Sequence, residues 1–151
     1  MDAFELLKKD HEKVSGIFEK LDSTTERGVK TREELFTQLK QELDVHAQIE
    51  EQIFYPAIKE AQETHEITLE AYEEHAIVKQ LLGELEQLPK DDETWGAKLT
   101  VLKENVEHHV EEEEGEMFPA AKQVLSSEQI EALGQRMEAA KKEEKKAMAA
   151  G

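Results

Sequence analysis

One short segment occurs twice in the chain, and this repeat constrains the fold more than any other feature of the sequence. Residues 46–56 read HAQIEEQIFYP and residues 109–119 read HVEEEEGEMFP. Both copies begin with His, carry a Glu pair from the fifth place, have an aromatic residue at the tenth place and end in Pro. Residues four apart lie on one face of an α-helix, with about 5–6 Å between their Cβ atoms. Each copy therefore predicts a helix that offers an imidazole and a carboxylate side by side.

A second pair of histidines extends the repeat beyond this segment. His11 lies in DHEKV and His75 lies in EHAIV, each preceded by an acidic residue and followed three residues later by Val. The chain is therefore predicted to consist of two copies of one helical hairpin. In each hairpin the first helix contributes a His and the second contributes His-x-x-x-Glu.

Apolar side chains recur at steps of three and four, the pattern typical of helices that pack in a bundle. Pro56 should kink or end the helix that contains it, because proline lacks a backbone N–H. The connections are short, so the fold is predicted to be all-α: an up-down-up-down four-helix bundle over residues 1–125, with an additional C-terminal helix over 126–151. Helices are expected over about residues 2–21, 32–55, 64–88, from 94 onward and from 126 or 127 onward.

Composition supports a helical protein and excludes several classes of function. The 151 residues include only 7 Gly and 3 Pro, which favours helices over turn-rich strands. The net charge of −17 argues against nucleic acid or an anionic membrane as a partner, because both carry negative charge. The chain has no cysteine, which excludes thiolate metal sites and disulfides. Its start, MDAFELLKKD, lacks the pattern of a signal peptide, so we expect a cytoplasmic protein.

Six titratable side chains occupy stripe positions where a bundle normally buries Leu or Val. Burying carboxylates without partners costs several kcal/mol each, so they require hydrogen bonds from the imidazoles or a bound metal. Imidazole and carboxylate together suit iron, manganese or zinc. Two carboxylates among four imidazoles are enough to bridge two metal ions about 3.5–4 Å apart, whereas one tetrahedral zinc would leave ligands over. The candidate metal ligands are His11, His46, Glu50, His75, His109 and Glu113.

From residue 4 to residue 119 the chain resembles the hemerythrin-like family of HHE cation-binding domains. The resemblance rests on the doubled His-x-x-x-Glu-Glu motif with its closing aromatic-Pro pair, and on the tail SSEQIEALGQRMEAAK. It implies two non-haem iron ions as cofactors, one held by His11 and His46 and the other by His75 and His109. It also implies that the two glutamates of the set bridge the ions.

Two departures from the blood-type hemerythrins bear on function. Those proteins have a second His one turn from the third-helix His, whereas His75 has Ala71 and Lys79 at those places. One metal is then a ligand short, or takes one from Tyr72, Glu74 or solvent. Those proteins also place an Asp five residues after the fourth-helix His, where this chain has a Glu at four. Both changes favour an open coordination position for peroxide, oxygen or nitric oxide over reversible oxygen carriage.

Several neighbouring residues are weaker candidates. His108 precedes His109 and has Glu112 four residues on, so a register shift is an alternative, although the stripe and the aromatic-Pro pair favour His109. Tyr72 is a possible hydrogen-bond donor near the site or a packing residue. The others have structural interpretations: a surface histidine for His65, solvated or outer carboxylates for Glu51, Glu111, Glu112 and Glu114, and core caps for Tyr55 and Phe118.

Three functions stay open at this point. The first is a di-iron protein that binds dioxygen or a related small ligand, as a sensor or a store. The second is a di-iron enzyme that consumes peroxide or nitric oxide, and the third is a module that stores or delivers iron or zinc. A ferritin-like site is disfavoured, because no Glu lies three residues before any of the histidines. A haem bundle would leave Glu50 and Glu113 without a purpose.

Overall fold

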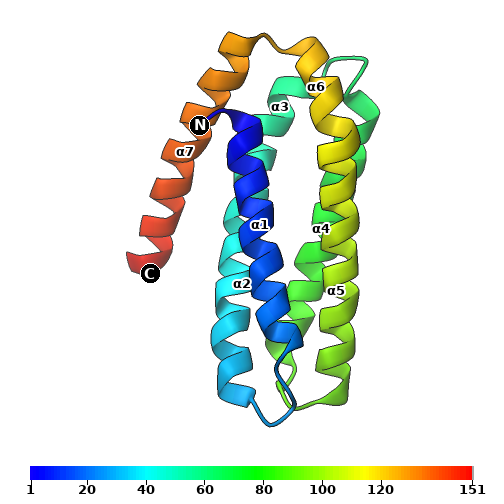
Figure 1. The fold of residues 1–151 in the computed structure, drawn as a ribbon, viewed down its shortest axis with the longest axis vertical. Helices are drawn as coiled ribbons and strands as arrows, with labels where there is room; N and C mark the ends of the chain where they lie inside the picture. The colour runs from blue at the N-terminus through cyan, green and yellow to red at the C-terminus, as the bar shows by residue number, and fades with distance from the viewer. Residues whose placement is uncertain (151) are drawn as a thin grey trace.

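Four long helices form an antiparallel bundle, and a further long helix lies along its outside (Figure 1). The structure is a computed structural model that describes residues 1–150. The bundle helices are α1 (Ala3–Asp22), α2 (Val29–Ile49), α4 (His65–Gln87) and α5 (Glu93–Glu112). The outer helix is α7 (Ser127–Ala150). The predicted all-α bundle with an additional C-terminal helix is confirmed. The division of the chain at residue 125 stays a prediction.

The apolar core consists of two clusters, one on each side of the histidines. Along α1, Phe4 and Leu7 belong to one cluster and Val14 and Phe18 to the other, with His11 between them. On each of the other bundle helices, taken with its continuation, the histidine likewise lies between residues of the two clusters, which follow one another in the reverse order along α2 and α5. The polar site therefore lies between two apolar layers that exclude water from above and below. None of the helices described over residues 1–150 is both long and apolar enough to cross a membrane.

Both long helices that carry a His-x-x-x-Glu motif widen into a π-helical turn at the Glu. These turns are η1 (Glu50–Phe54) and η2 (Glu113–Met117), and the helices continue as α3 (Tyr55–Ile58) and α6 (Phe118–Val124). Each proline lies in the first turn of the segment that continues beyond the π-helical turn. The sequence predicted a kink or a helix end at the proline. The structure shows instead a change of helical winding that begins at the Glu, with the helix continuing beyond the proline.

The wider turn changes which side chains face the interior. In an uninterrupted α-helix, five residues turn the chain by about 500°, which would place Tyr55 roughly 140° around the helix from Glu50. A π-turn holds more residues per turn, so the same five residues bring Tyr55 back towards the face of Glu50. π-bulges are frequent at functional sites for this reason.

Helix α7 docks against the beginning of α1 through a close backbone approach. Leu133 and Met137 are buried in the same apolar cluster as Phe4 and Leu7. A Cβ added at Gly134 would collide with the Met1 carbonyl oxygen and would lie 2.6–2.7 Å from backbone atoms of Asp2. Only a residue without a Cβ allows the two segments to approach so closely.

We expect Gly134→Ala to weaken this docking. The added methyl group would push α7 away from the α1 terminus, at a cost of about 1–3 kcal/mol in the free energy of unfolding. The measurement is chemical denaturation followed by circular dichroism. Gly83→Ala is the matched control, because a Cβ at Gly83 meets no atom within 4 Å. Equal stability of the two variants would contradict the proposed close approach.

Candidate metal centre

The structure brings all six predicted site residues together at one level of the bundle. Each bundle helix contributes one imidazole, and the two glutamates enter from η1 and η2. The set is the one predicted from the sequence: His11, His46, Glu50, His75, His109 and Glu113. Glu50 is 0% exposed and Glu113 is 1% exposed. Four imidazoles thus surround two carboxylates that water does not reach.

Each glutamate links the two hairpins. Oε1 of Glu50 lies 3.1 Å from Nε2 of His46 and 3.1 Å from Nε2 of His75. Glu113 places Oε1 3.1 Å from Nε2 of His11, and Oε2 3.1 Å from Nε2 of His109. Each carboxylate therefore faces one imidazole from the first hairpin and one from the second, which is the arrangement of a bridging ligand.

Five of these inward atoms are buried without a hydrogen-bond partner among the described residues. They are Nε2 of His11, Nε2 of His46, both carboxylate oxygens of Glu50 and Oε1 of Glu113. They approach one another to about hydrogen-bond distance without hydrogen-bond alignment. Leaving a buried polar atom unsatisfied costs about 1–3 kcal/mol, and more when it is charged. A metal bound at their common focus would satisfy all five.

A second layer of carboxylates fixes the orientation of every imidazole. In each case the Nδ1 atom is held and Nε2 is left pointing inward, the tautomer that a metal-binding histidine requires. A carboxylate on the outer nitrogen is the usual companion of a metal-bound histidine. The pairs are His11–Glu114 at 2.6 Å, His46–Asp10 at 3.0 Å, His75–Glu51 at 2.9 Å and His109–Glu74 at 2.7 Å.

The carboxylates strongly favour protons on two of the imidazoles when no metal is bound. Burial alone would lower the pKa of His46, but the charge of Glu50 and the hydrogen bond that His46 donates to Asp10 raise it to about 10. Burial would likewise lower the pKa of His109, yet the neighbouring carboxylates of Glu113, Glu50 and Glu74 raise it to about 12. Protons and metal ions therefore compete for the same nitrogens.

The hydroxyl of Tyr55 also points into the centre. It donates a hydrogen bond of 2.7 Å to Oε2 of Glu113 and lies 3.3 Å from Nε2 of both His75 and His109. Tyr55 is fully buried, and burial together with the two glutamates raises the pKa of its hydroxyl well above the usual value. Its ring is buried in the apolar cluster, as expected of a core cap, but the contacts of its hydroxyl with the centre were not predicted from the sequence.

A sequence model of the family described as "Hemerythrin HHE cation binding domain" matches residues 2–121. The chain belongs to this family. The matched segment includes all six residues of the centre, Tyr55 and all four outer carboxylates, and it ends before α7. The HHE domain is thus a hemerythrin-like, metal-binding helical bundle.

Solved and curated relatives agree with this assignment. A crystal structure of a hemerythrin HHE cation-binding domain-containing protein, the Rv2633c homologue from Mycobacterium kansasii, superposes with a TM-score of 0.85 and 29% identity. That match covers 97% of this chain and 89% of the other. The uncharacterized protein Rv2633c of Mycobacterium tuberculosis is 32% identical over 92% of this chain and 84% of its own length. A DNA nickase from Nostoc is 29% identical over 93% of this chain, which spans only 39% of that protein.

The remaining candidates of the HHE domain lie outside the centre or in its second layer. His108 is exposed and pairs with Glu112 at 2.9 Å, so the inward register is that of His109. His65 is exposed on the surface. The ring of Tyr72 packs edge-on against Tyr55 at 5.3 Å, and its hydroxyl donates to a backbone carbonyl at 3.4 Å. Phe118 is buried in the apolar cluster, as expected of a core residue.

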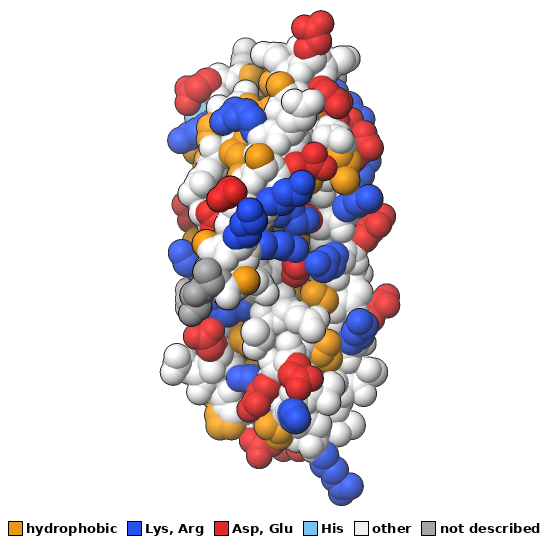
Figure 2. Space-filling model, turned by 90° about the vertical axis from the view of Figure 1, so that its left-hand side faces the viewer, with side chains coloured by type: hydrophobic (Ala, Val, Ile, Leu, Met, Phe, Trp, Pro, Cys, Tyr) orange, Lys and Arg blue, Asp and Glu red, His pale blue; other side chains and the backbone are white. Residues whose placement is uncertain are grey.

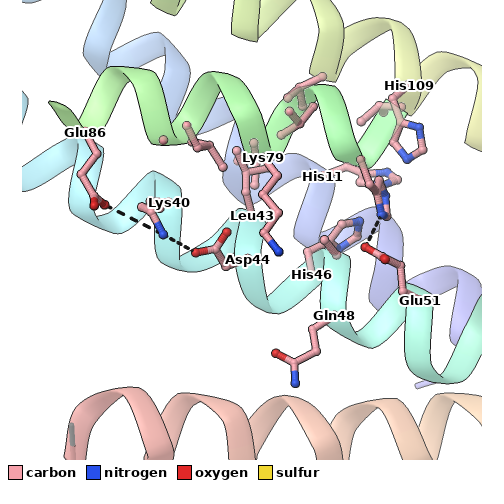
Figure 3. Close-up of a pocket in the computed structure, with 18 of the residues that line it drawn as sticks. His11, Lys40, Leu43, Asp44, His46, Gln48, Glu51, Lys79, Glu86 and His109 are labelled. Atoms are coloured by element: carbon pink, nitrogen blue, oxygen red, sulfur yellow. Dashed lines mark hydrogen bonds and ion pairs between the residues drawn. The ribbon is translucent and has the colours of Figure 1, made fainter. Parts of the chain in front are cut away.

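A cavity of about 730 Å³ leads from the surface to the histidines and is lined mainly by α2 and α4. Figure 3 shows His11, His46 and His109 at its inner end, with Lys40, Asp44 and Glu86 paired at the other side. Its middle is apolar, formed by Val14, Leu43, Val78, Leu82, Val106 and Val110. A small, uncharged ligand could reach the centre by this route without breaking any of the hydrogen bonds that orient the imidazoles.

Proposed function

We propose that this HHE domain holds two non-haem iron ions and binds dioxygen or a related small ligand there. The iron pair would supply redox electrons and Lewis acidity. His11 and His46 would hold one ion, and His75 and His109 the other, with Glu50 and Glu113 shared between them. Manganese or zinc would suit the same donors, so the choice of iron rests on the family and on the role proposed for Tyr55 as a ligand to ferric iron.

The five unpartnered buried atoms carry this proposal. Hydrogen bonds within the protein leave them unsatisfied, and the four residues that carry them each offer a ligand atom within 4.8 Å of the others. Charge leads to the same conclusion: two buried carboxylates, with four more acidic side chains behind the imidazoles, call for several positive charges at the centre. Two metal ions meet both requirements, whereas one tetrahedral ion would leave donors over.

Tyr55 makes the two halves of the centre unequal. The half with His75 and His109 has three donors of its own when the Tyr55 oxygen is included. The half with His11 and His46 has two, and the cavity reaches all four histidines, so Tyr55 alone distinguishes the halves. The open position for an external ligand is therefore expected on the His11/His46 half.

A peroxide-consuming enzyme is the second candidate, and Tyr55 is the observation that favours it. Reduction of peroxide consumes protons, and the Tyr55 hydroxyl is a proton donor held 2.7 Å from Glu113 in a dry site. Once it had given up this proton, Tyr55 would be a phenolate ligand, which favours the ferric state and opposes reversible carriage of oxygen. Storage or delivery of iron or zinc remains a third use of the same ligands.

Elemental analysis tests the metal centre directly. Protein expressed in iron-supplemented cells and purified without a chelator should hold about two irons per chain, with ferric absorption bands in the near-ultraviolet. Absence of metal, or a single zinc retained in Glu50→Ala, would overturn the bridged site. If the protein does hold two irons, rapid peroxide turnover by the loaded protein would favour the enzyme. A reversible oxygenated species without turnover would favour the sensor or store.

Tyr55→Phe should bleach any visible band of the iron-loaded protein while leaving the iron content close to two per chain. A phenolate oxygen on ferric iron absorbs visible light by charge transfer, whereas phenylalanine cannot ligate. The measurement pairs an absorption spectrum with elemental analysis. Tyr72→Phe is the matched control, because its ring packs against Tyr55 but its hydroxyl binds a backbone carbonyl. An unchanged visible spectrum in Tyr55→Phe would show that the hydroxyl is not a ligand.

A further inference from the structure

We propose that Lys141 of α7 is a positioning residue for the His11/His46 half of the centre, acting through Asp10. The inference rests on the proposed function, because it assigns a control element to the same site. It makes the C-terminal helix part of the metal site, although α7 lies outside the segment that matches the family.

A continuous chain of contacts joins α7 to His46. The Lys141 ammonium pairs with Oδ1 of Asp10, and Oδ2 of Asp10 accepts a hydrogen bond of 3.0 Å from Nδ1 of His46. On its other side, the ring of His46 presents Nε2 to Glu50 at 3.1 Å. Each oxygen of Asp10 thus has one partner, one from the outer helix and one from the centre.

Asp10 differs from the other three outer carboxylates in its burial. Only 4% of its side chain is exposed, compared with 35% for Glu114, 39% for Glu51 and 24% for Glu74. Water can solvate those three, but it barely reaches Asp10. A buried carboxylate needs a charged or hydrogen-bonding partner of its own, and α7 supplies one in Lys141. The dependence of Asp10 on Lys141 therefore affects the His11/His46 half of the centre, where the open coordination position is expected.

Helix α7 also carries a second lysine that serves as an internal comparison. Lys145, one turn further along, pairs with Glu42 on α2 at 3.0 Å, and Glu42 has no contact with the six residues of the centre among the described pairs. Viewed from the side of α7, basic side chains gather across the middle of the molecule (Figure 2). Both lysines fasten α7 to the bundle, but only Lys141 is connected to a metal-facing histidine.

The expected consequence is a change in the metal site without a change in fold. With Lys141 present, the charge of Asp10 is balanced and its carboxylate is held in the rotamer that orients His46. In Lys141→Gln the balance is lost and Asp10 is free to turn. Disturbing the outer partner of a metal-bound histidine typically weakens metal binding about 10–100-fold. The reduction potential of the iron should also fall, because loss of the positive charge of Lys141 stabilises ferric iron relative to ferrous iron.

The test measures iron affinity and reduction potential for Lys141→Gln, Lys141→Arg, Lys145→Gln, Asp10→Asn and the double variant with Asp10→Asn and Lys141→Gln. We expect Lys141→Gln to bind iron at least about tenfold more weakly and Lys145→Gln to match the wild type. In an Asp10→Asn background the Lys141 change should have no further effect, and Lys141→Arg should restore the wild-type values. Equal losses in the two lysine variants would mean that both merely dock α7, and the proposal would fail.

A second readout does not depend on metal. In the metal-free protein, nitrogen NMR of the imidazoles should show the Nδ1–H of His46 perturbed by Lys141→Gln and not by Lys145→Gln. If the wild type bound no iron, the proposed function would fail while this readout still tested the link. An unperturbed His46 signal in Lys141→Gln would overturn the inference even where the wild type held two irons.

Discussion

Glu50→Ala is expected to remove both metal ions, reducing the content from about two per chain to almost none. The reason is geometric, because Oε1 of Glu50 lies 3.1 Å from an imidazole of each hairpin. Its loss deprives both halves of a shared anion and leaves His46 and His75 facing each other without a charge between them. The loss should therefore exceed that from any single histidine, whose removal leaves both carboxylates in place. Elemental analysis of the purified variant measures the effect.

Glu111→Ala is the control for this prediction. Glu111 lies two residues before Glu113 on the same helix, but its side chain is exposed. Its removal subtracts one negative charge from the surface and should leave the metal content unchanged. Circular dichroism should show that both variants keep their helices, since the two apolar clusters are untouched. A Glu50→Ala protein that still held two ions would rule out a bridging role for this carboxylate.

The fold and the inner residues of the site could be predicted from sequence because both are encoded by helical periodicity. His11, His46, His75 and His109 stand at stripe positions, and stripe positions of a bundle face its interior. Duplication supplied the second constraint, since two equal hairpins must bring equivalent residues to one level. Their convergence in the structure follows from these two regularities.

Tyr55 could not be placed by the same reasoning, because its position depends on the π-turn. Counted along an ideal α-helix, it falls well away from the face of Glu50, and nothing in the local sequence measures the winding of the turn. The outer carboxylates were only partly predicted for a different reason. Glu51 and Glu114 follow the two central glutamates directly and belong to the repeated motif, whereas Glu74 and Asp10 do not. All four reach a histidine of a different helix, which the sequence does not reveal.

The Asp10–Lys141 pair joins residues 131 positions apart, and no periodic pattern relates them. The acidic residue before His11 and the Lys-rich end of the chain were both visible in the sequence. Their pairing depends on how α7 crosses α1, which is set by the close approach at Gly134. Tertiary contacts of this kind arise from packing geometry and not from local preference.

Metal loading should stabilise the protein strongly, and the stabilisation should grow with pH. A ligand at 1,000 times its Kd stabilises the folded state by about 4 kcal/mol, which corresponds to roughly 8–16 °C in Tm for a chain of this length. In the metal-free protein, the folded-state pKa of His46 is raised from 6.5 to about 10. Its contribution to stability is complete below about pH 6.5 and is progressively lost as the pH rises towards 10.

The stability of the loaded protein should depend little on pH above about 6.5, because metal replaces the protons on His46 and His109 and the imidazoles of the unfolded chain are also deprotonated there. If both protons are released, the apparent affinity should rise about a hundredfold per pH unit near neutrality, tenfold for each proton. Thermal unfolding of loaded and metal-free protein between pH 6 and 9 measures both trends. The two melting temperatures should diverge as the pH rises, and His65→Ala should leave the divergence unchanged because His65 is exposed and distant from the set. Parallel curves would mean that metal does not compete with these protons, and that the imidazoles of the centre are structural partners of the glutamates instead of ligands.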